Sequence, residues 1–192
     1  MKLNYVIVDI EEIEFGPKSI SEMSTLAMDG QRNWRQRGHL SPPDGPRGKM
    51  KVRSIAALAV RAWASFLGYP PSESSKIGAD AASSVIYWAL LSEVAGVDPL
   101  LVVGPRSAVG AFHQKFDDDH ETALSIAQFE GKKPFTFVFW SDRDCPNLRH
   151  GSTEVADEDG PIVTRSINLV ALGRNIVEAA HGPLFKISVG NP

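Results

Sequence analysis

Apolar and polar positions near the start of the chain predict two short strands followed by two short helices. The apolar runs at residues 3–9 and 11–15 favour strands, and a Gly-Pro pair ends them. Ser19 is placed to cap a helix that continues through ISEMSTLA, with a Glu at the capping-box position. A second helix is predicted over residues 31–37, QRNWRQR, and Gly38 ends it.

Two longer helices are predicted next. In the stretch IAALAVRAWASFLG, apolar side chains recur at helical spacing behind Ser54, the expected N-cap, and Gly68 ends the helix. One face of this helix is predicted to hold Ile55, Leu58, Ala59, Ala62 and Phe66. The following helix, residues 73–95, is rich in Ala and Ser, so another helix can approach it closely. We expect it to pack mainly on the helix of residues 55–67, with contact to a dimer partner as the alternative.

The second half alternates apolar runs and polar segments as a small α/β unit does. Residues 135–140, FTFVFW, give the strongest strand signal in the chain. The other predictions are strands at 100–103, 162–169 and 184–189, helical or irregular structure over 107–130, a long exposed loop over 142–160 and a helix over 170–180. Between the two halves of the helical part, residues 39–52 carry turn signals and are predicted to form a small hairpin or an extended loop.

Length and composition limit the class of protein. The 192 residues suit one ordinary domain or two small ones, and 43% hydrophobic residues are enough for a packed core. No apolar run approaches the length of a membrane-spanning helix, and the acidic N-terminal stretch is unlike a signal peptide. Cys145 is the single cysteine, so an internal disulfide is excluded. We expect a cytoplasmic protein with no membrane partner.

Charge is distributed unevenly along the chain. The whole chain has a formal net charge of −3, but the window from Gln31 to Arg53 holds seven Arg or Lys against one Asp, a balance of +6. A mildly acidic chain that gathers its cations into one short segment favours an anionic partner for that segment. From the charges alone, the plainer interpretation is a solvated basic helix and an ordinary polar loop.

The side chains in this basic window are those that recognise nucleic acid. On a helix, Arg32 and Gln36 are neighbours one turn apart, and Trp34 points away from them and can anchor the helix to the core. Arg, Asn and Gln pair bidentately with base edges, whereas the later cations are expected to meet phosphates. The predicted DNA-contacting residues are Gln31, Arg32, Asn33, Arg35, Gln36, Arg37, Arg47, Lys49, Lys51 and Arg53. With about five or six phosphate contacts, log K should fall against log salt with a slope of about −4 to −5.

The order of features from residue 19 to residue 80 resembles the winged helix-turn-helix head of MerR-type transcription regulators. The shared pattern has an aromatic in the second helix, a Gly with apolar neighbours, a Pro, a basic wing, and a long helix that ends in Leu-Gly. Its places are held here by Trp34, Gly38-His39-Leu40, Pro42-Pro43, Arg47-Gly48-Lys49, Arg53, Ile55, Leu58, Val60, Phe66, Leu67 and Gly68. The first helix and turn are shorter than the family's, and Met50 and Val52 stand where an aromatic often precedes the long helix.

The resemblance, which covers the N-terminal third, implies a fold and a function. The implied fold is α+β: residues 1–96 form a winged helix-turn-helix DNA-binding domain with two long helices and a short N-terminal strand extension. Residues 97–192 form a small α/β unit for sensing, dimerisation or partner binding, where an effector or a protein partner would bind. The implied function is sequence-specific transcription regulation by a homodimer on double-stranded DNA, with the recognition helix in the major groove and the wing on phosphates.

Other residues that could carry chemistry are expected to be structural. His113 and His120 lie near Asp117–Asp119, but an exposed acidic loop is the better interpretation than a metal cluster. Metal-sensing members of the resembled family use several thiolates, whereas Cys145 is alone and is expected to be an inert loop thiol. Gly104–Ser107 is expected to be a plain turn rather than an anion site. We therefore expect no metal, no cofactor and no enzymatic activity, since no constellation of nucleophile, base and electrophile appears.

Two other functions stay open. A phage-type excisionase or architectural DNA-binding protein shares a winged head but acts by bending DNA, and a sizeable second domain argues mildly against it. A protein–protein interaction module would use the basic segment as a docking face. Bending of DNA distinguishes the first alternative from a regulator, and salt-insensitive binding to a protein without affinity for duplex DNA identifies the second.

Overall fold

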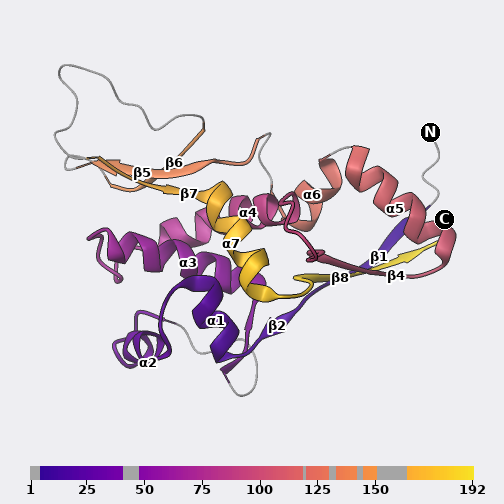
Figure 1. Ribbon diagram of the computed structural model, residues 1–192. Helices are drawn as coiled ribbons and strands as arrows, with labels where there is room; N and C mark the ends of the chain where they lie inside the picture. Colours follow the sequence, from indigo (N-terminus) through magenta and orange to yellow (C-terminus); the bar gives the residue numbers. More distant parts are fainter. Residues whose placement is uncertain (1–4, 41–47, 119, 130–132, 142–144, 151–163) are drawn as a thin grey trace.

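The computed structural model has a mixed α+β fold (Figure 1). It describes residues 5–40, 48–118, 120–129, 133–141, 145–150 and 164–192. Within these ranges the chain forms seven helices and eight strands, and the strands belong to three small sheets. The predicted α+β class is therefore confirmed. None of the helices in the described ranges has the length and apolar character needed to cross a membrane.

One three-stranded sheet joins the two ends of the chain. Its strands, in spatial order, are β1 (Val6–Glu12), β8 (Phe185–Gly190) and β4 (Leu100–Val103). The central strand β8 is antiparallel to β1 and parallel to β4. Alternate residues of β8 are buried, because one face of the sheet lies on the core. The last strand predicted from the sequence is thus the centre of this sheet, and the first is its edge (Figure 1).

Three helices form the centre of the hydrophobic core. They are α3 (Val52–Phe66), α4 (Ser75–Leu90) and α7 (Leu169–Ala180). Glycines allow α4 to approach both of its neighbours: a Cβ at Gly78 would lie 2.7 Å from the Ala57 carbonyl oxygen, and a Cβ at Gly173 would lie 2.7 Å from the Val85 carbonyl oxygen. The Ala- and Ser-rich helix therefore packs on α3, as the sequence predicted.

The N-terminal part adds two short helices and a small ribbon. Helix α1 (Pro17–Ser24) packs against α3 and α7, whereas α2 (Met28–Gln36) projects at one corner of the molecule (Figure 1). Strands β2 (Glu14–Phe15) and β3 (Met50–Lys51) pair antiparallel. Residues 39–52 were predicted to form a hairpin or a loop; instead β3 pairs with β2, which precedes α1, and residues 41–47 lie outside the described ranges. This pairing sets the buried side chains of Phe15 and Met50 opposite each other.

A second three-stranded sheet lies beside α3 and α4 (Figure 1). Its strands are β6 (Asn147–Arg149), β5 (Phe137–Ser141) and β7 (Thr164–Asn168), all antiparallel, and β5 is central, as suits the strongest strand signal. The predicted loop over 142–160 is therefore wrong where β6 forms, because Leu148 pairs with Val138 of β5. Helices α5 (Arg106–Asp118) and α6 (Glu121–Ile126) occupy the segment predicted as helical or irregular.

The predicted starts of several helices were wrong. Helix α2 begins at Met28 rather than at residue 31, and α4 begins at Ser75 rather than at residue 73. Helix α1 begins at Pro17 rather than behind Ser19, because proline fits the first position of a helix, where no N–H is needed. Helix α3 begins at Val52, ahead of Ser54, directly after the ribbon. The Glu12 carboxylate accepts a backbone N–H in its first turn and so replaces the predicted serine cap.

The predicted ends of helices were more accurate. Gly38 and Gly68 both follow helix ends and have φ values of +72° and +91°, which glycine adopts without strain. Helix α4 ends at Leu90, earlier than the predicted residue 95. Phe66, predicted on the core face of α3, is 80% exposed, since none of the described elements covers it at the C-terminal end of the helix.

The two predicted units, residues 1–96 and 97–192, share a sheet and a core. Strand β1 pairs with β8, and α7 packs against α1 and α4. The buried apolar side chains form one cluster, whose members come from both units and range from Tyr5 to Val189. The boundary at residue 96 therefore does not separate two cores. That residues 1–96 bind DNA and residues 97–192 serve sensing, dimerisation or partner binding stays a prediction.

Candidate nucleic-acid interface

The turn between α1 and α2 is held by buried polar contacts. Thr25 ends α1 in the left-handed conformation, with φ +60°. The Ser24 hydroxyl donates to the Ile20 carbonyl at 2.6 Å and accepts the Leu26 N–H at 3.3 Å. From the other side, the Gln31 side-chain amide donates to the Leu26 carbonyl at 2.9 Å. The direction in which α2 leaves α1 is thus fixed from both helices.

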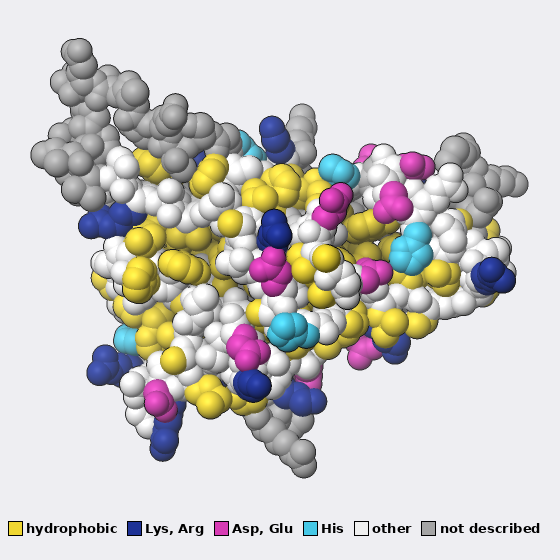
Figure 2. All heavy atoms as spheres, in the orientation of Figure 1, with side chains coloured by type: hydrophobic (Ala, Val, Ile, Leu, Met, Phe, Trp, Pro, Cys, Tyr) yellow, Lys and Arg dark blue, Asp and Glu magenta, His cyan; other side chains and the backbone are white. Residues whose placement is uncertain are grey.

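Helix α2 has one face in solvent and one against the molecule. The solvent face carries Arg32, Asn33 and Gln36, continues to the C-cap residue Arg37, and is exposed at all four positions. The inner face carries Gln31, which is 1% exposed, together with the half-buried Trp34 and Arg35. Figure 2 shows Lys and Arg side chains at the lower left, the corner where Figure 1 places α2. Four of the predicted DNA-contacting residues therefore lie together on one accessible surface, which we call the α2 face.

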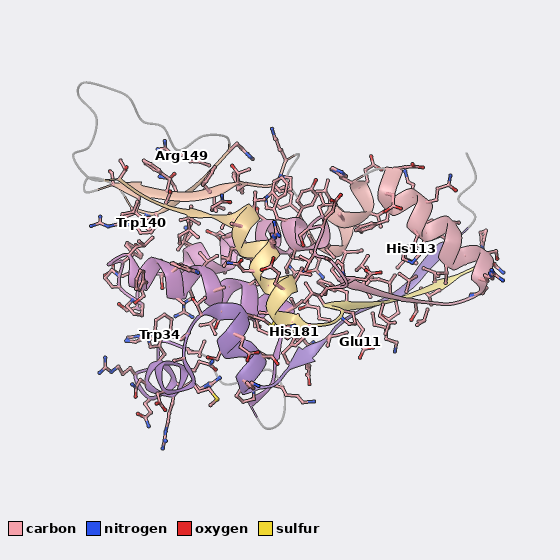
Figure 3. The ribbon with its side chains drawn as sticks, viewed as in Figure 1. Glu11, Trp34, His113, Trp140, Arg149 and His181 are labelled. Carbon is pink, nitrogen blue, oxygen red and sulfur yellow. The ribbon has the colours of Figure 1, made fainter. Side chains whose placement is uncertain are left out.

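Trp34 anchors α2 to the rest of the protein. Its ring lies on the side of α2 toward α3 (Figure 3) and packs against the hydrophobic core. The Cζ atom of Arg61, in α3, lies 5.5 Å from the ring centroid. Trp34 also shares a hollow of about 460 Å³ with Leu26 and with the Trp63 and Phe66 side chains of α3. The inward direction predicted for Trp34 is therefore observed.

The chain turns back toward the core immediately after α2. The Gly38 N–H donates to the Arg35 carbonyl at 3.0 Å, and the His39 N–H donates to the Trp34 carbonyl at 2.8 Å. The positive φ of Gly38 makes this pair of bonds possible. Leu40, next in the chain, is 7% exposed. Hydrogen bonds thus hold both ends of α2, while its outer face is exposed to solvent.

The ribbon of β2 and β3 adds basic side chains near the start of α3. Lys49 and Lys51 are exposed, and Lys51 lies opposite Glu14 in the ribbon. Arg47, which was also predicted to contact phosphates, lies outside the described residues. The cations that the structure places here are therefore Lys49 and Lys51.

Arg53, predicted to contact DNA, is engaged inside the molecule. Its Nε lies 3.3 Å from Oε1 of Glu12, and its backbone N–H donates to Oε2 of the same carboxylate at 3.0 Å. Its Nη1 donates to the Ser83 hydroxyl at 3.1 Å and to the Ala127 carbonyl at 3.0 Å. Because Nε and Nη1 are engaged in these contacts and Nη2 is buried, we leave Arg53 out of the candidate interface. Gln31 is left out as well, because its side chain is buried and bonded to the turn.

Arg35 also faces inward. Its Nε and Nη2 atoms are buried and have no hydrogen-bond partner within the described part of the chain. Sequence spacing pairs Arg35 with Gln31, on the inner side of α2, rather than with the residues of the α2 face. Removing Arg35 would disturb packing as well as charge, so the test of DNA binding below uses other arginines.

The remaining candidates from the sequence lie elsewhere. Nδ1 of His120 is 2.9 Å from the Tyr87 hydroxyl, and burial raises the pKa of Tyr87. His113 is on α5, at the far side of the molecule from α2 (Figure 3). Within the described ranges, no three side chains of His, Cys, Asp or Glu are grouped to hold a metal ion. Cys145 is exposed, and the His150 ring stacks on Phe135 with centroids 4.6 Å apart.

The segment Gly104–Ser107 forms a turn into α5. Gly104 has φ +154°, and a Cβ there would come within 2.2 Å of the Val189 carbonyl oxygen. Only glycine fits such a close approach to β8. The Ser107 hydroxyl is turned toward the chain end, 3.2 Å from Oδ1 of Asn191. The glycine thus serves the packing of the sheet.

Arg61 was not among the residues that the sequence singled out, although the structure places it against α2. It lies in the middle of α3, is 9% exposed, and reaches both Trp34 and the chain after α2. The sequence does carry a signal, because Arg61 is an isolated charge within the apolar stretch IAALAVRAWASF. A buried arginine requires internal acceptors, but the sequence does not show which ones.

No family model matches the chain, and neither a curated protein nor a solved structure matches it. What the molecule itself offers is a short helix that is fixed at both ends and on its inner side. Its outer side presents two arginines, an asparagine and a glutamine in a regular array. That array is the candidate site from which a function is proposed.

Proposed function

We propose that the protein is a sequence-specific, double-stranded DNA-binding transcription regulator whose head resembles the MerR type. The observation that carries the proposal is the α2 face: Arg32, Asn33 and Gln36 of α2 and Arg37, its C-cap residue, are all exposed, and hydrogen bonds hold both ends of the helix. These are the side chains that form bidentate hydrogen bonds with guanine and adenine edges. A helix of this kind is narrow enough to enter the major groove.

The order of the surrounding elements supports the proposal. Helix α1, a tight turn and α2 follow one another, and the basic segment after α2 leads into β3. Pairing of β3 with β2 positions Lys51 at the start of α3, and Lys49 directly precedes β3; both lysine side chains are exposed. In a winged head, such a ribbon contacts the phosphate backbone while the second helix reads the groove.

The geometry within the α2 face supports base recognition. Arg32 and Gln36 are one turn apart, and so are Asn33 and Arg37, so the face presents two neighbouring donor pairs. Asp29, in the first turn of α2, stabilises the positive end of the helix dipole. The net charge of −3 is no obstacle, because binding to DNA depends on the local field.

We also propose that the protein binds DNA as a homodimer and that the sequence from residue 97 onward serves sensing, dimerisation or partner binding. A dimer places two α2 helices on half-sites separated by about one helical turn of DNA, roughly 34 Å. A selected site should then show two-fold symmetry. Its absence would argue for a monomer on a single half-site.

The experiment is selection of duplexes from fragmented genomic and randomised pools, followed by fluorescence anisotropy on the selected duplex across a salt series. The Arg32→Ala/Arg37→Ala variant should bind this duplex at least about thirtyfold more weakly, since each arginine contributes about 1–3 kcal/mol. The control Arg106→Ala/Arg174→Ala removes the same charge from two exposed positions on other helices and should bind like the wild type. With Arg47, Lys49 and Lys51 as the remaining candidates for phosphate contact, the salt slope of the wild type should be about −3 for each bound chain.

Two results would contradict the proposal. If no duplex is enriched and the wild type has no affinity for DNA at low salt, the α2 face is a docking surface for another protein. If both double variants weaken binding equally, the attraction is a general electrostatic one. Bending of the selected duplex in phased-site gels would favour the architectural alternative over a regulator.

A further inference from the structure

Arg61 connects α3 to the segment that ends α2. Its Nη2 donates to the backbone carbonyl of His39, directly after α2, and to the carbonyl of Pro71 at 3.3 Å. Its Cζ lies 5.5 Å from the centroid of the Trp34 ring, on the inner side of α2. One side chain of α3 therefore holds α2 at two points, the aromatic ring in the helix and the carbonyl that follows it.

The aliphatic part of Arg61 is fixed as well. It lies in the contact between α3 and α4, where a Cβ at Gly78 would come within 2.6 Å of the Arg61 Cγ. This close packing restricts the side chain to the direction that points toward α2. The guanidinium group is thus oriented in advance, before any ligand is present.

Packing alone does not explain an arginine at this position. Burial lowers the pKa of Arg61, and its Nε has no hydrogen-bond partner among the described residues. Carbonyl groups and an aromatic ring attract the guanidinium but do not neutralise its charge. An apolar side chain of similar volume is often at least as stabilising as a buried charge. What the guanidinium group adds is a fixed arrangement of hydrogen-bond donors, because its planar fork sets the direction as well as the length of each bond.

We propose that Arg61 is a positioning residue for DNA recognition: it sets the orientation of α2 and so the direction of the α2 face. The inference rests on the function proposed above for that face. Bidentate contacts with base edges require good alignment, whereas contacts with phosphates tolerate small rotations. Loss of the Arg61 contacts should therefore reduce sequence discrimination more than it reduces general affinity for DNA.

The test uses Arg61→Lys, which keeps the charge and the stem but replaces the fork by a compact ammonium group. Anisotropy gives the affinity for the selected duplex and for a shuffled duplex of equal length and composition. We expect the ratio of the two affinities to fall at least about tenfold, while the affinity for the shuffled duplex and the salt slope stay unchanged. Arg61→Met should behave likewise, and the exposed control Arg106→Lys should keep the wild-type ratio.

A folded Arg61→Lys variant with the wild-type ratio would overturn the proposal, and so would equal weakening on both duplexes. Should Arg61→Met fail to fold, Arg61→Lys decides alone. Amide exchange at Gly38 and His39 should also be faster in Arg61→Lys, with α3 protected as in the wild type. If the wild type binds both duplexes equally well, the proposed function itself is refuted. If the wild type and Arg61→Lys both prefer the selected duplex to the same degree, only the role of Arg61 is refuted.

Discussion

Three arginines in the N-terminal half show how surroundings assign different roles to the same side chain. Arg32 is exposed on α2, Arg53 bridges Glu12, Ser83 and the Ala127 carbonyl, and Arg61 is buried between helices. All three carry the same formal charge, and two of them belong to the basic window that the sequence singles out. The sequence identified the window, but it could not show which cations have internal partners, because those partners come from distant parts of the chain.

The Arg53 contacts should matter for stability rather than for DNA binding. Arg53→Met should lower the free energy of unfolding by about 2–4 kcal/mol, because the partly buried Glu12 carboxylate loses its cation. Urea denaturation measures this change. The control is Arg174→Met, which breaks an exposed pair with Glu178 at 2.8 Å and should cost less than about 1 kcal/mol. Equal, small losses in the two variants would contradict this role for Arg53.

At the scale of elements, apolar runs and glycine breaks located most helices and strands. Strand β5 and helix α3 follow directly from FTFVFW and IAALAVRAWASFLG. The start of α3 was not predictable in the same way, because this helix is capped by a carboxylate of β1 rather than by a residue next to it in sequence. The pairing of β3 with β2 was missed for the same reason: the partner strand precedes two helices. The start of α1 follows a local rule for Pro17, whose pair with Gly16 was interpreted only as the end of the strands.

The contact between α4 and α7 depends on the absence of a side chain at Gly173. Gly173→Ala should lower the free energy of unfolding by about 1–3 kcal/mol, because its Cβ would meet backbone atoms of α4 that cannot move aside easily. Gly110→Ala is the matched control, since Gly110 lies in α5 with no atom within 4 Å of the added Cβ. That variant should be stabilised by about 0.5–1 kcal/mol from helix propensity. Similar effects at both glycines, measured by thermal unfolding, would refute the close-packing account.

At the scale of the whole molecule, segments that are far apart in the sequence pack against one another. The first and last strands pair, and α7 packs on the N-terminal helices. No local pattern predicts this, because the pairing joins residues at opposite ends of the sequence. Of the ten residues predicted to contact DNA, the four of the α2 face are exposed as residue type and helical spacing indicated, and their contact with DNA stays a prediction. Arg61 emerges only from the tertiary packing.

The packing between distant segments also bears on whether the proposed DNA-binding head could fold alone. Helix α1, which fixes the turn before α2, packs directly against α7, and Arg53 at the start of α3 contacts the carbonyl of Ala127 after α6. The proposed DNA-binding head thus shares its core with the second half of the chain. A head expressed alone would expose apolar surface that α7 and β8 normally cover.

The most direct measurement of the central claim is repeated duplex selection with Gln36→Ala beside the wild type. Gln36 is on the α2 face and is exposed, so its replacement leaves the core intact. If this face reads base edges, the variant should recover the wild-type motif with the preference lost at one position in each half-site, a change of about 1–3 kcal/mol there. An identical motif from both proteins, or no motif from either, would contradict sequence recognition by α2.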